Sequence, residues 1–246
     1  MKLTIRALII LFIVGITSCS DDDNPIDKSF DYREYFPLDS GNLWEYEYYA
    51  INSDGSNYSA PFGRETLVAI DSTVYLGRTA TEMNFEYVNN GNTSQREFLF
   101  SKDSNQIAIS GLEIRIHDSL AITENRWITL YDLDQYTGPW INSQIRFNDT
   151  IIGESQYFGT INIEGEKGES TRIEYEGKRI EAFTSKLFMY FNIERKRNQD
   201  TIFITKREEY EYRYAEGIGI VYTSFKQYQD TNFVSGNKKI LIDREF

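Results

Sequence analysis

The sequence predicts an all-β fold, an antiparallel meander that curls into a barrel, a half-barrel or a sandwich. The first indication is composition, because aromatic residues form 15% of the chain, with 18 Tyr and 16 Phe. Such side chains suit a pleated, half-buried surface better than a helix. The second is pattern, because short runs of alternating apolar and polar residues recur between turn signals, and no long amphipathic helix is evident.

The clearest predicted strand runs from Ile202 to Tyr214. Residues at alternate positions fall into two sets. One set is apolar and contains Ile202, Ile204, Tyr210, Tyr212 and Tyr214; the other is polar and contains Thr205, Arg207, Glu209, Glu211 and Arg213. This period of two predicts one half-buried and one wet face. Lys206 and Glu208 interrupt the apolar parity, and we expect them where the strand extends past the core.

A second clear pattern places Trp44, Tyr46 and Tyr48 in alternation with Glu45 and Glu47. Further predicted strands are Glu65–Ile70, Thr79–Val88, Arg96–Ser101, Gln106–Ile116, Arg126–Tyr131, Tyr157–Glu164, Thr171–Tyr175 and Arg179–Ile193. Turn signals such as Asn89-Asn90-Gly91-Asn92 and Glu176-Gly177 separate them, which favours hairpins. Within Asp132–Phe147 the Gly138-Pro139 pair breaks the pattern, so a loop or one short helix is expected there. No linker divides residues 35–246, which we interpret as a single β domain.

The first 18 residues have the features of an export signal. Lys2 and Arg6 give a charged start, and residues 7–16 form an uninterrupted apolar run. A membrane-spanning helix needs about 20 apolar residues, so this run is too short to cross a bilayer.

The signal ends in Ile16-Thr17-Ser18-Cys19, which contains the only cysteine of the chain. This motif resembles the lipobox of bacterial lipoproteins, and the resemblance implies cleavage before Cys19 and attachment of a diacylglyceryl group to its sulfur, with fatty acyl chains such as palmitate. Two or three acyl chains hold a protein stably at a membrane, whereas one chain binds only marginally. The alternative is an ordinary signal peptide followed by a chance cysteine.

An acidic run, Ser20, Asp21, Asp22 and Asp23, follows the cysteine directly. It resembles the surface-export signal of Bacteroidetes-type lipoproteins, which implies the outer face of the outer membrane; a solvated acidic spacer is the alternative. Residues 19–34 contain Pro25 and few bulky apolar groups, so we interpret them as a lipidated acidic tether.

Two more segments look familiar. Residues 35–46, which include Pro37 and Trp44, and residues 214–221, which include Gly217 and Gly219, resemble the opening and the closing strand of uncharacterised β-rich lipoproteins. The resemblance implies no activity. Gly217 and Gly219 permit a bend or bulge before the last strand.

Charge excludes some partners. The chain has 26 Lys and Arg against 38 Asp and Glu, a formal net charge of −12, and removal of residues 1–18 leaves 24 against 38, or −14. Such a surface repels phosphate backbones, so no nucleic-acid partner is expected.

No catalytic residue can be assigned from the sequence. The single histidine, His117, precedes Asp118-Ser119, but adjacency in sequence does not create a catalytic relay, and we expect a structural or surface role. Alternate acids occur at Glu45/Glu47, Asp132/Asp134 and Glu209/Glu211, within the broad range of a glycosidase pair, although solvated charge explains them better. We expect no metal and no cofactor, because zinc-ligand, EF-hand and phosphate-binding motifs are missing.

These observations predict a lipid-anchored envelope protein with a non-enzymatic binding or structural role at the outer membrane surface. Its partners would be the membrane, through the anchor, and a glycan, lipid or protein ligand. Two alternatives stay open. One is a carboxylate-based glycan hydrolase, and the other is a periplasmic half-barrel carrier of lipid or lipoprotein.

Overall fold

The computed structural model describes residues 36–103, 106–117, 119–132 and 138–246, and within these ranges the chain is all strand and turn. The first strands are β1 (Leu43–Ala50), β2 (Gly63–Tyr75), β3 (Arg78–Asn89), β4 (Asn92–Asp103), β5 (Gln106–Ser110), β6 (Leu112–His117), β7 (Leu120–Glu124) and β8 (Ile128–Asp132). The others are β9 (Trp140–Ile152), β10 (Ser155–Lys167), β11 (Thr171–Tyr175), β12 (Lys178–Arg197), β13 (Asp200–Ala215), β14 (Gly219–Gln229) and β15 (Asn232–Glu245). The described ranges include no helix that could cross a bilayer.

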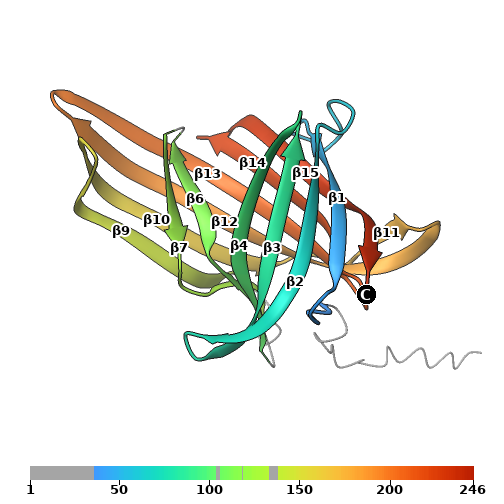
Figure 1. Ribbon diagram of the computed structural model, residues 1–246. Helices are drawn as coiled ribbons and strands as arrows, with labels where there is room; N and C mark the ends of the chain where they lie inside the picture. The colour runs from blue at the N-terminus through green and yellow to red at the C-terminus, as the bar shows by residue number, and fades with distance from the viewer. Residues whose placement is uncertain (1–35, 104–105, 118, 133–137) are drawn as a thin grey trace, which may run out of the picture. The chain divides into compact units, whose positions relative to one another are not determined.

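One antiparallel sheet contains all of these strands except β6 and β7, which pair with each other. Its order is β8-β5-β4-β3-β2-β1-β15-β14-β13-β12-β10-β9, and β11 pairs with β12. Figure 1 shows the sheet curling from β9 and β10, through β12 to β15, round to β1, β2, β3 and β4. The edge strand β8 comes back against β10 and β12, so the sheet is a nearly closed barrel. The predicted all-β antiparallel fold is confirmed.

The interior is filled mainly by aromatic and aliphatic side chains. Trp44 and Tyr46 are each 1% exposed, as the alternating pattern predicted. The Trp44 indole donates to the carbonyl of Ile218 at 2.6 Å, and the Tyr46 hydroxyl donates to that of Ile220 at 2.9 Å. These bonds satisfy the polar atoms of large buried rings, so the rings contribute burial without an unpaired donor.

Lys206 and Glu208 correct the sequence prediction. Their side chains are only 11% and 4% exposed, and they form an ion pair with 2.6 Å between Nζ and Oε1 inside the barrel. Lys206 also lies over the Phe191 ring, and the Tyr210 hydroxyl donates to Glu208 at 3.0 Å. The pair keeps the interior parity of β13 because each charge has a partner, which is the condition for burying ions.

Three predicted boundaries were wrong. Gln106–Ile116 is two strands instead of one, because Gly111 has a φ of +86° that ends β5. The stretch expected to be a loop or short helix contains the first part of β9, from Trp140. The turn at Gly217 precedes two strands instead of one. These strands, β14 and β15, form a hairpin, and the rings of Tyr228 and Phe233 pack 6.0 Å apart beside its turn.

The two ends of the sheet order meet through side chains. The Asn142 amide of β9 accepts from the Thr129 backbone N–H at 2.7 Å and donates to the Thr129 carbonyl at 2.9 Å. The Trp140 indole donates to the same carbonyl at 3.3 Å. Asn142 therefore supplies to β8 one donor and one acceptor, as a neighbouring strand residue would.

We predict that Asn142→Leu destabilises the protein by about 1–3 kcal/mol, because it leaves the Thr129 backbone groups without this partner. Gln144→Leu is the matched control, since the Gln144 amide is exposed and bonds the Asn162 side chain; its effect should stay within about 0.5 kcal/mol. Urea unfolding measures both. Equal losses for the two variants would show that Asn142 does not close the sheet.

Candidate functional site

The site begins where β5 leaves the sheet. The ladder between β4 and β5 ends at the pair Leu99 and Ser110, and Gly111 then turns the chain away. If the ladder continued, Glu113 would lie opposite Arg96. Only their side chains are in contact, with 3.4 Å between Nη2 and Oε1. The backbones of the two strands separate at Gly111, so β4 has no strand partner on this side over residues 92–98 in the described part of the chain.

An open cleft of about 400 Å³ lies between β4 and the hairpin β6–β7. Phe85, Arg96, Glu97 and Phe98 form the sheet wall, Leu112, Glu113 and Thr123 form the hairpin wall, and Ile109, Gly111 and Asn125 lie at the base. A smaller hollow of about 240 Å³ adjoins it and shares Glu97, Phe98, Gly111 and Asn125. Apolar rings with a few polar groups are the usual lining of a binding site, and this size is that of a small ligand site.

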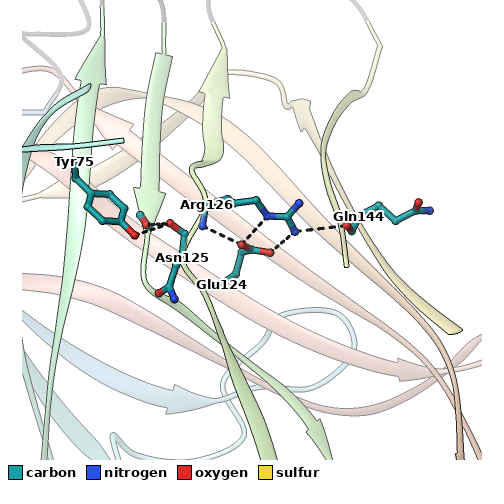
Figure 2. Close-up of polar contacts among 6 residues, drawn as sticks. Tyr75, Glu124, Asn125, Arg126 and Gln144 are labelled. Atoms are coloured by element: carbon teal, nitrogen blue, oxygen red, sulfur yellow. Dashed lines mark hydrogen bonds and ion pairs between the residues drawn. The ribbon is translucent and has the colours of Figure 1, made fainter. Parts of the chain in front are cut away.

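The base of the hairpin is fixed by hydrogen bonds. The Gly111 N–H donates to the Glu124 carbonyl at 3.0 Å. The carbonyl of Asn125 accepts from the Ser110 hydroxyl at 2.7 Å and from the Tyr75 hydroxyl at 3.1 Å. Figure 2 shows the Tyr75 hydroxyl pointing at the Asn125 backbone on one side of this base, and the Glu124–Arg126 pair on the other.

Arg126 holds the buried Glu124 carboxylate. Its guanidinium donates to both carboxylate oxygens, at 2.9 and 2.6 Å, and its backbone N–H donates a third bond at 2.9 Å. It also reaches the Gln144 carbonyl of β9 at 3.5 Å, which Figure 2 shows on the far side of the guanidinium. Burial alone would raise the pKa of Glu124, but the bonds from Arg126 outweigh burial, so the pKa lies below its usual value.

The rest of the hairpin is fastened to the opposite wall. Ile114 and Ile116 are 0% and 1% exposed. The Lys206 ammonium of β13 donates to the Arg115 carbonyl at 2.6 Å, and His117 Nε2 lies 3.0 Å from the Tyr157 hydroxyl of β10. The cleft thus lies between two walls that are each held in place.

A second buried acid lies elsewhere in the interior. The Glu65 side chain is 0% exposed and accepts from Lys239 at 2.5 Å and from the Tyr48 hydroxyl. Burial first, and then the charge of Glu65, raise the pKa of Tyr48 well above its ordinary value, so this hydroxyl stays a donor. Sequence reasoning missed Glu65 as well as Glu124, although Glu65 shares its parity with the buried Leu67 and Ala69.

The acid pairs Glu45/Glu47 and Glu209/Glu211 do not line the cleft. Glu47 pairs with Arg64, Glu209 with Arg207 and Glu211 with Arg213, at 3.2, 3.8 and 2.7 Å, on the parity opposite to the buried rings. Asp132 accepts from Gln106 at 2.9 Å; its partner Asp134 lies outside the described residues.

His117 has a structural place in the hairpin. Its Nδ1 lies 3.2 Å from the Ser119 hydroxyl, across the turn between β6 and β7. Asp118, the third member of the segment noted in the sequence, lies outside the described residues, as do Cys19 and the export residues Ser20, Asp21, Asp22 and Asp23. The described residues contain no group of three or more His, Cys, Asp or Glu side chains that could hold a metal ion.

Comparison with solved structures finds two similar chains. A crystal structure of a candidate lipoprotein from Parabacteroides distasonis matches with a TM-score of 0.51 at 13% identity, over 85% of this chain and 97% of that one. A candidate exported protein with a YmcC-like fold from Bacteroides fragilis matches with a TM-score of 0.48 at 12% identity, over 86% and 99%. The first likeness shows a shared fold and nothing further. No family model and no curated protein matches the sequence.

We predict that Arg126→Met destabilises the protein by about 1–2 kcal/mol at pH 7, because the buried Glu124 carboxylate loses its partner and the half-exposed guanidinium limits the effect. The folded pKa of Glu124 is lowered, so its ionised form stabilises the fold above the unfolded pKa of about 4.3, and this contribution disappears as pH falls through the folded value. The difference between variant and wild type should therefore shrink below about pH 4.

Arg64→Met is the matched control, since Arg64 also pairs with a glutamate but is 69% exposed. Its effect should be at most about 0.5 kcal/mol. Chemical unfolding at a series of pH values measures both variants. A loss for Arg126→Met that is the same at pH 3 and pH 7 would contradict the role given to Glu124.

Proposed function

We propose that this chain is a lipid-anchored protein of the bacterial cell envelope, whose β domain has a non-enzymatic binding role at the outer membrane surface. The observation that carries the anchor is the sequence Ile16-Thr17-Ser18-Cys19, in which the only cysteine of the chain follows a charged and apolar signal. Residues 1–18 would be removed, residues 19–34 would form the tether, and residues 35–246 would form the domain.

Several findings support this proposal. The fold is shared with a protein described as a candidate lipoprotein from a Parabacteroides species. A thiol at the signal's end is the nucleophile that takes up a diacylglyceryl group, and the two or three acyl chains of such a lipoprotein give stable membrane attachment. Ser20 and the three aspartates Asp21 to Asp23 supply the export motif. The net charge of −14 after removal of residues 1–18 suits a surface protein whose copies repel one another and stay soluble.

The binding role rests on the cleft between β4 and the hairpin β6–β7. The sheet interior is less suited to an acyl chain, because Ile114 and Ile116 occupy it and Lys206 and Glu208 carry charge there. The cleft is open, has aromatic walls at Phe85 and Phe98, and is bordered by charged groups. A ligand held there would not require the barrel to open.

We predict that cells grown with an alkyne fatty acid label this protein, and that Cys19→Ser abolishes the label because the acceptor sulfur is lost. The mature wild-type protein should begin at Cys19 by mass spectrometry. Ser20→Ala is the control and should keep the label. An unlabelled wild-type protein, or one that retains residues upstream of Cys19, would refute the anchor.

We also predict that changing Asp21, Asp22 and Asp23 together to Ala leaves the acylation intact but removes the protein from the cell surface, because the motif acts after lipidation. Protease digestion of intact cells measures this, and changing Asp230 and Glu245 to Ala serves as a charge control away from the motif. If digestion of the triple variant is unchanged, the acidic run is only a spacer and not an export signal.

A further inference from the structure

We propose that the cleft binds an extended polypeptide segment, which adds a strand to the unpaired edge of β4 over residues 92–98. This inference rests on the proposed binding role of the cleft and is independent of the lipid anchor. It names the class of partner, which the proposed function leaves open.

The backbone of β4 has an edge without a strand partner over residues 92–98 in the described part of the chain. This strand pairs with β3 from Asn92 to Phe100, but with β5 only from Leu99 to Asp103. In an antiparallel strand, alternate residues direct both N–H and C=O away from the existing partner. Another strand supplies acceptors and donors at the matching spacing, and a lipid chain or a sugar ring does not.

The strand β6 is held away from this edge. If β5 continued straight, β6 would cover residues 92–98 itself, with Glu113 opposite Arg96. The chain instead turns at Gly111, and the Arg115 carbonyl is bonded to Lys206 on the opposite wall. The space of about 400 Å³ between β4 and β6 is thus a fixed feature of the fold.

The side chains along β4 define the chemistry of the incoming strand. Arg96 and Phe98 line the cleft and Ser94 shares their parity, and residues directly opposite one another in a strand pair lie on one face of the sheet. The Glu113 carboxylate is shared between Arg96 at 3.4 Å and Arg115 at 3.8 Å, so two guanidinium groups face one acid. An acidic residue therefore suits the position opposite Arg96, and apolar residues suit those opposite Ser94 and Phe98.

The test uses the full lipidated chain in detergent micelles and a fluorescein-labelled peptide, Thr-Val-Thr-Glu-Thr-Val-Thr, followed by fluorescence anisotropy. One control peptide has Lys in place of Glu, and another carries N-methyl groups on alternate residues, which removes backbone donors but keeps every side chain. We expect the N-methylated peptide to bind roughly tenfold more weakly or worse, since it loses hydrogen bonds to β4. We expect Arg96→Glu to reverse the preference between the Glu and Lys peptides.

A second pair of variants locates the binding. Thr123→Trp places a large side chain in the cleft, whereas Thr201→Trp changes another exposed threonine, which lies on β13 outside the cleft. Thr123→Trp should abolish peptide binding, and Thr201→Trp should leave it unchanged. Hydrogen exchange should show that the peptide protects alternate amides within residues 92–98.

Absence of binding, or binding that ignores both N-methylation and Thr123→Trp, would overturn the inference. If Thr123→Trp instead displaces a co-purified lipid or glycan while the peptide fails to bind, the cleft keeps its binding role and strand addition is wrong. Failure of fatty-acid labelling affects the anchor alone.

Discussion

The contact between β8 and β9, the two end strands of the sheet, determines how completely the barrel is closed. Other neighbours in the sheet order are joined by backbone ladders, whereas the two end strands meet through the Asn142 amide and the Trp140 indole on the backbone of Thr129. A complete backbone ladder between β8 and β9 would close the sheet and leave no strand edge unpaired. Because closure relies on side chains, the chain between β5 and β8 can leave the sheet as a hairpin, cross the interior and fasten to β10 and β13.

The interior charges follow from the same arrangement. The Arg115 carbonyl of the crossing hairpin needs a donor from β13 to hold it against that wall, and apolar side chains could not provide one. Lys206 supplies that donor, and Glu208 neutralises Lys206. Breaking such a pair costs more than the pair itself contributes, so we interpret it as a device that fixes the hairpin's position.

The sequence predicted the fold class because the alternation of Trp44, Tyr46 and Tyr48 and of the tyrosines of β13 is strong and local. It failed where tertiary partners decide. Lys206 and Glu208 violate the apolar pattern locally, and contacts formed only in the folded chain, with each other, Tyr210 and the Arg115 carbonyl, make their burial possible. Gly111 offered a visible signal for the break between β5 and β6, but whether a glycine continues a strand or ends it depends on what the following residues pack against. The cleft arises from that break, so it could not be predicted from motifs.

The sheet order also has a consequence for how the polypeptide acquires its structure. The strands nearest the two ends of the folded part, β1 and β15, are neighbours in the middle of the sheet, with Leu43 opposite Glu245. Contacts between residues so distant in sequence form slowly, because a long loop must close before any contact compensates for the lost entropy. The ladder between β1 and β15 therefore cannot form before β15 has been synthesised, so the middle of the sheet is completed late.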